Sequence, residues 1–127
     1  MTKADALHTF WAGFGLPAML EEAVPDRGGV DYPYITYNQV TDSFEREVYI
    51  TASIWDRTAP GYNATQALDA KVEEISNAIG QGGIWQPYDG GYIWIRRGSP
   101  FCNSLGDPSD DAIRRRVLNI VAEYWSI

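Results

Sequence analysis

Residues 47–55, EVYITASIW, show the most regular alternation of side chains in the chain. Successive side chains of a strand point to opposite faces of a sheet, so this segment predicts a strand with two distinct faces. One face is expected to enter the hydrophobic core, and it carries Val48, Ile50, Ala52 and Ile54. The other face carries Tyr49 and Trp55, so neither face of this strand is purely polar.

Three further segments are rich in β-branched and aromatic residues, which favours strands within residues 33–40, 84–98 and 114–124. The motif YDGGY at the centre of residues 84–98 suits a tight turn with positive φ, so this segment predicts a hairpin. The stretch rich in Gly, Pro and Ser that follows, up to Pro108, is expected to be a loop.

Two segments show helical spacing of apolar residues. In residues 3–12 the apolar positions are Ala6, Leu7, Phe10 and Trp11. In residues 64–79 the apolar spacing is flanked by Asn63, a favourable N-cap, and by Gly80, which suits the position after a helix. A short helical turn is also expected at residues 17–22.

The order of these elements predicts an α+β fold, in which an antiparallel sheet of about four to five strands has two helices packed on one face. A length of 127 residues with 45% hydrophobic residues suits one hydrophobic core, so residues 1–127 are expected to form a single domain. No apolar run approaches the length of a membrane span, so no membrane segment is expected.

Two helices cover only one face of such a sheet. The opposite face would carry an unusual number of aromatic and aliphatic side chains: Tyr49, Trp55, Trp94, Val117, Val121 and Trp125. An exposed apolar surface of this kind is typical of a contact surface, which favours self-association. The alternative is that residues 13–31 fold over this face.

The formal net charge is −7, from 17 acidic and 10 basic residues. Because neutralisation of phosphates supplies most of the affinity for nucleic acids, this charge argues against tight binding of DNA or RNA. The chain has one histidine, His8, and one cysteine, Cys102, and it contains no nucleotide-binding or hydrolase motif. We therefore expect no catalytic site, no cofactor and no metal site.

The stretch DPSDDAIRRR raises a competing possibility, because Asp107, Asp110 and Asp111 could bind a divalent cation. A metal-dependent nuclease would need further acids, for which Asp56, Asp69 and Asp89 are available. The three arginines that follow would repel a cation. The favoured interpretation is a turn, with ion pairs from Arg114, Arg115 or Arg116 to these aspartates or to a neighbouring subunit. Alternation along the strand places Arg114 and Arg116 on one face of the sheet and Arg115 on the other.

The phrases PYITY, ITASIW, PYDGGYIWIRRGSPF and DPSDDAIRRRVLNI, in this order and spacing, resemble tail-terminator proteins of siphophages and prophages, also called tail-completion or minor capsid proteins. The resemblance runs from about Leu16 to the C-terminus. It implies a subunit made in the cytoplasm of a bacterial host and assembled into the tail or neck of the virion. There it would form a ring, expected to be a hexamer, that caps the tail tube, ends its polymerisation and docks the filled head. The partners would be other copies of the chain, the tail tube protein and head connector proteins.

The expected oligomer interface combines the exposed sheet face with the charged stretch, and its candidate residues are Trp55, Trp94, Asp110, Asp111, Arg114, Arg115, Arg116 and Trp125. Acids that could line the lumen of such a ring are Glu45, Glu47, Asp56 and Asp89. A head-completion or connector protein of the phage neck remains an alternative function, and a metal-dependent nuclease is a further one.

Overall fold

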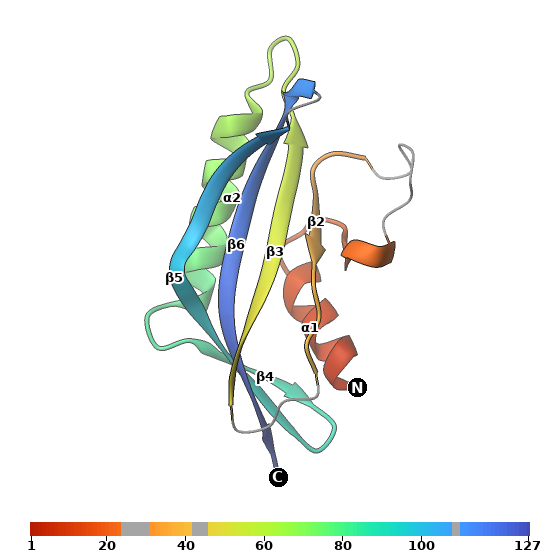
Figure 1. The fold of residues 1–127 in the computed structure, drawn as a ribbon, viewed down its shortest axis with the longest axis vertical. Coiled ribbons are helices and arrows are strands. Elements are labelled where there is room, and N and C mark those ends of the chain that lie inside the picture. Colours follow the sequence, from red (N-terminus) through yellow and green to blue (C-terminus); the bar gives the residue numbers. More distant parts are fainter. Residues whose placement is uncertain (24–30, 42–45, 108–109) are drawn as a thin grey trace.

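The computed structural model describes residues 1–23, 31–41, 46–107 and 110–127, and it has an α+β fold. Two helices, α1 (Lys3–Ala12) and α2 (Ala64–Ile79), lie on the same side of a curled sheet of long strands (Figure 1). In the described part of the chain the sheet has six strands, in the order β1-β2-β3-β6-β5-β4. The strands are β1 (Ala18–Leu20), β2 (Tyr34–Tyr37), β3 (Glu47–Arg57), β4 (Ile84–Tyr88), β5 (Gly91–Asp107) and β6 (Asp110–Ser126).

Both predicted helices are confirmed, and each begins at a residue that caps it. At the start of α1, Thr2 accepts a hydrogen bond from the Asp5 N–H, and the Asp5 carboxylate accepts one from the Thr2 N–H, both at 3.0 Å. The Asn63 side chain accepts a hydrogen bond from the Gln66 N–H at 3.2 Å and so begins α2.

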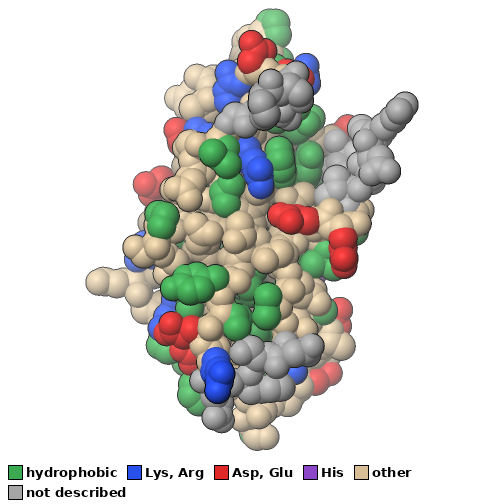
Figure 2. Space-filling view, in the orientation of Figure 1, with side chains coloured by type: hydrophobic (Ala, Val, Ile, Leu, Met, Phe, Trp, Pro, Cys, Tyr) green, Lys and Arg blue, Asp and Glu red, His purple; other side chains and the backbone are tan. Residues whose placement is uncertain are grey.

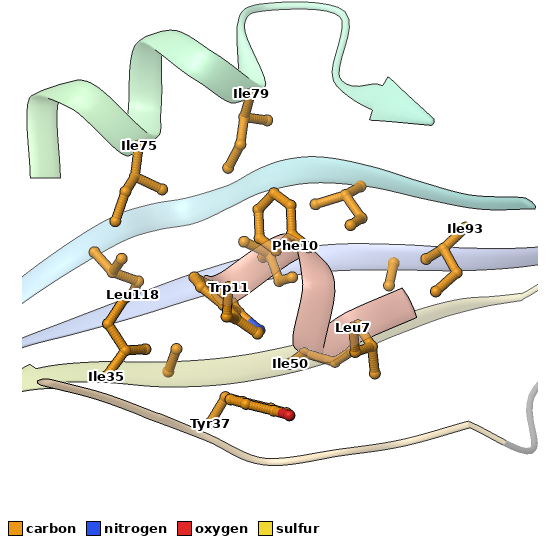
Figure 3. Close-up of a cluster of buried hydrophobic side chains, with 14 of the residues drawn as sticks. Leu7, Phe10, Trp11, Ile35, Tyr37, Ile50, Ile75, Ile79, Ile93 and Leu118 are labelled. Carbon is orange, nitrogen blue, oxygen red and sulfur yellow. The ribbon is translucent and has the colours of Figure 1, made fainter. Parts of the chain in front are cut away.

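The core lies between the two helices and the sheet (Figure 3). Leu7, Phe10 and Trp11 reach it from α1, and Ile75 and Ile79 reach it from α2. The sheet contributes buried residues that alternate along its strands: Ile35, Ile50, Ala52, Ile54, Ile93, Ile95, Leu118 and Ile120. Val48, which was also expected on the core face of β3, is only partly buried. The side chains between them along each strand point to the other face of the sheet.

The expected antiparallel sheet of four to five strands is wrong in detail, because the sheet is mixed. β1 runs parallel to β2, with Ala18 opposite Ile35, and it replaces the helical turn expected at residues 17–22. Leu16, Met19 and Leu20 have helical spacing, but so short a segment has weak intrinsic preference. Pairing with β2 therefore decides its structure. The helical component that remains is a 3₁₀ turn at Glu21–Ala23.

The prediction of a loop in the segment up to Pro108 is also wrong, because β5 continues through this segment to Asp107. A shift in register between Arg97 and Cys102 takes up the Gly98, Ser99 and Pro100 stretch, after which pairing with β6 resumes. β6 correspondingly begins at Asp110 rather than at residue 114. Gly and Pro thus mark an irregularity within a strand here, and not its end.

The β4–β5 hairpin is confirmed, with Tyr88 paired to Gly91 across a two-residue turn. Gly90 has a φ of 95°, as a turn of this kind requires. Gly91 is needed for a different reason, because a Cβ there would lie 1.9 Å from the backbone oxygen of Trp125. The close approach of this backbone to β6 fixes where Trp125 lies.

We predict that Gly91→Ala lowers the free energy of unfolding by about 3 kcal/mol, because a backbone carbonyl cannot move aside as a side chain can. Gly82→Ala is the matched control, since a Cβ at Gly82 meets nothing within 4 Å, and it should change stability by less than about 1 kcal/mol. Urea unfolding followed by tryptophan fluorescence measures both. Equal midpoints for the two variants would contradict the packing at Gly91.

Candidate functional site

The sheet face opposite α1 and α2 is called the open face, because neither of these helices packs on it (Figure 1). Figure 2 views this face and shows hydrophobic side chains in separate groups, with polar side chains and backbone between them. The middle of the face is polar, where the Thr51 hydroxyl lies 3.4 Å from Asn119 Oδ1. Val121, expected to be exposed, is only 8% exposed. The apolar surface is therefore divided and not continuous.

One group on the open face centres on Trp55, a predicted interface residue. Its ring stacks on Tyr34, with centroids 6.4 Å apart, and its Nε1 donates a hydrogen bond to Thr36 Oγ1 at 2.9 Å. The guanidinium carbon of Arg115 lies 4.5 Å from the centroid of the Trp55 ring. Arg115 Nε donates to the buried Ser53 hydroxyl at 3.0 Å. The site therefore holds an arginine over an aromatic ring in a defined position.

The second group centres on Trp94, also a predicted interface residue. Its ring lies between Trp85, stacked at 5.3 Å with an interplanar angle of 5°, and the guanidinium of Arg96 at 4.0 Å. Arg96 Nη2 donates to Glu47 at 2.9 Å and to Glu123 at 2.7 Å. The charge of this arginine is therefore balanced within the chain.

An apolar hollow of about 440 Å³ lies beside this group and is lined by Trp85, Tyr92 and Trp125. These three residues are 55%, 43% and 38% exposed, which is high for such large apolar side chains. The sequence reasoning named Trp125 but missed Trp85 and Tyr92 as candidates. The signal was present in the hairpin, because Trp85 pairs with Trp94 and Tyr92 lies two positions before Trp94.

The described residues of the charged stretch make contacts that differ from those expected. Asp110 Oδ2 forms an ion pair with Arg57 Nη1 at 2.5 Å. Arg57 was not among the partners expected from the sequence. Arg114 donates instead to the backbone oxygens of Asp111 and Ile113. The side chain of Asp107 lies outside the described residues.

Arg115 and Arg116 lie on opposite faces of the sheet, as alternation predicted. Arg116 faces α2, where its Nε donates to Asp69 at 3.0 Å, and only 6% of the residue is exposed. It therefore joins β6 to α2 within the subunit. Arg115 lies on the open face and is the one of this pair that a partner can reach.

The acids suggested for a ring lumen have different surroundings. Asp56 is 2% exposed and accepts hydrogen bonds from the Tyr62 hydroxyl and from the Arg57 N–H, so it is not available to line a channel. Glu47 is bound to Arg96, and Asp89 binds the N-terminal ammonium group. Glu45 lies outside the described residues.

His8, Cys102 and the acidic residues are the groups that the sequence offers for catalysis or metal binding. Within residues 1–23, 31–41, 46–107 and 110–127, no group of three or more His, Cys, Asp or Glu side chains is placed to hold a metal ion. His8 Nδ1 lies 3.3 Å from the Tyr37 hydroxyl. Burial raises the pKa of the Cys102 thiol, which disfavours the reactive thiolate. Neither α1 nor α2 has the length and apolar character of a membrane-spanning helix.

Comparison of the chain with protein-family models, curated proteins and solved structures gives no match. The open face is therefore interpreted from its own geometry.

We predict that Arg116→Ala lowers the free energy of unfolding by about 2–3 kcal/mol, because it removes a buried side chain between β6 and α2. Arg115→Ala should cost only about 1 kcal/mol, since it removes a half-buried cation–π contact and one hydrogen bond. Guanidinium unfolding of both variants tests this difference. Equal losses would contradict the placement of these neighbours on opposite faces.

A second prediction concerns the hydrogen bond from Tyr62 to Asp56, which raises the pKa of Tyr62 to about 12 from an ordinary value near 10. Since the folded-state pKa is raised, this bond stabilises the fold fully below pH 10 and the contribution is lost as the pH rises through 12. NMR titration of the tyrosine ring carbons should show Tyr62 protonated at pH 11 and, in Asp56→Asn, ionising nearer to 10. An unchanged titration in Asp56→Asn would show that the bond is absent in solution.

Proposed function

We propose that this chain is a structural subunit of a siphophage or prophage tail, which self-associates into a ring that caps the tail tube. The ring would end tube polymerisation and provide the surface to which the filled head docks. The resemblance of four separate segments to tail-terminator proteins supports this assignment. Two of these segments lie in the adjacent strands β3 and β6: ITASIW in β3, and most of DPSDDAIRRRVLNI in β6.

The observation that carries the proposal is the cluster of exposed aromatic side chains around the hollow of Trp85, Tyr92 and Trp125. Tryptophan, tyrosine and arginine are the residues most enriched among those that dominate binding energy at protein interfaces. All three types occur on the open face, where Trp55 and Trp94 each carry an arginine. Burial of this surface against a neighbouring subunit would stabilise an oligomer.

The net charge of the chain also supports a ring through which DNA passes. A ring of subunits that each carry a net charge of −7 repels the phosphate backbone, so DNA would pass without being retained. The same charge would favour docking to a surface of opposite charge on a tail tube or a head connector.

We predict that Trp85→Lys abolishes self-association, because it places a charge in the aromatic hollow at the proposed interface. Ala70→Lys adds the same charge at an exposed position on α2 and should associate as the wild type does. Sedimentation velocity over a range of concentrations measures the mass of each protein, and circular dichroism checks that each is folded. Equal association by the two variants would exclude the hollow from the interface.

The function itself is tested with tail tube protein that is polymerising in vitro. Addition of the wild-type chain should give shorter tubes with one end capped, as seen by negative-stain electron microscopy, and Trp85→Lys should have no effect. Unchanged tube lengths together with binding to filled heads would favour the head-completion alternative. Binding to neither would contradict both neck functions.

A further inference from the structure

The open face carries two arginines in the same arrangement but with different charge balance. Arg96 lies 4.0 Å from the Trp94 ring centroid, and Arg115 lies 4.5 Å from that of Trp55. Arg96 is neutralised by two carboxylates, whereas Arg115 forms no ion pair with any acid in the described part of the chain. The two sites therefore differ in charge balance, because only Arg96 has carboxylate partners.

Arg115 is held in place without a carboxylate partner. Its Nε is used by the hydrogen bond to Ser53, and its planar group lies over Trp55, which is itself fixed by Tyr34 and Thr36. An arginine fixed in this way loses little conformational entropy when it binds a partner. Its two terminal Nη groups remain as donors, and this fork matches the two oxygens of a carboxylate.

The surroundings of Arg115 suit an interface. The residue lines a hollow together with Glu21, Tyr34, Thr36 and Trp55. None of the ion pairs in the described part of the chain joins Arg115 to Glu21. Its cross-strand neighbour on β5 is Leu105, which is 48% exposed. A partner that covered Leu105 would also exclude water from the guanidinium, and exclusion of water strengthens a charged hydrogen bond.

We infer that Arg115, held over Trp55, binds an acidic side chain of a second copy of this chain. The inference rests on the proposed function, since it places this pair in the contact between subunits. A second copy is favoured by charge complementarity, because Arg115 is a cationic point on a chain with 17 acidic and 10 basic residues. Exposed acids without an ion pair in the described residues include Glu22, Glu73 and Asp111.

The test compares Arg115→Gln, Arg115→Lys and Arg115→Glu with the wild type by sedimentation equilibrium. Arg115→Gln should raise the dissociation constant at least about 30-fold, as expected for the loss of one member of a charged pair at an interface. Arg115→Lys keeps the charge but lacks the fork, so it should weaken association less than Arg115→Gln does. Arg115→Glu should give monomers that remain folded by circular dichroism.

Arg97→Gln is the matched control, because Arg97 is an exposed arginine of β5 that bonds to Ser76 on the helix-covered side. It should associate as the wild type does. A wild-type oligomer that persists unchanged in Arg115→Gln and Arg115→Glu would overturn the inference and leave the proposed ring standing. A wild type that stays monomeric at every concentration would overturn both the inference and the proposed self-association.

Discussion

The antiparallel pairing of β3 with β6 is the interaction on which the rest of the structure depends. It runs along the whole length of β3, from Glu47 opposite Glu123 to Arg57 opposite Ile113. This single register decides which side chains meet the helices and which face outward, because a shift by one residue would exchange the two faces. It places Arg116 against α2 and Arg115 over Trp55, so neighbours in the sequence have separate roles.

The open face uses its polar and charged groups to hold aromatic rings at defined positions. Trp94 is fixed between Trp85 and Arg96, and its Nε1 donates to the Gly82 oxygen. The rings are therefore exposed but already fixed in the free subunit. Because they lose little conformational freedom when a partner binds, the entropic cost of binding is lower. The separation of the aromatic groups by a polar middle strip also limits the unbroken apolar area that a free subunit exposes to water.

Much of this fold could be predicted from sequence, because both helices have apolar residues at helical spacing and β3 alternates strictly. The errors arose where pairing with a distant strand outweighs local preference, as in β1 and in β5 beyond Arg97. The candidate site was predicted in part. Alternation identified Trp55, Trp94 and Arg115, but the link between Arg57 and Asp110 joins strands far apart in sequence, and no local pattern reveals it. Exposure of Trp85 likewise depends on its place in an edge strand.

The proposed assembly buries the open face between copies of the chain. Hydroxyl-radical footprinting with mass spectrometry, performed over a range of protein concentrations, measures the exposure of each aromatic side chain directly. If the open face is buried in this way, oxidation of Trp85 and Trp125 falls as the concentration rises, while oxidation of Tyr62, outside the open face, stays constant. Oxidation of Trp85 and Trp125 that is independent of concentration while the oligomer forms would contradict this burial.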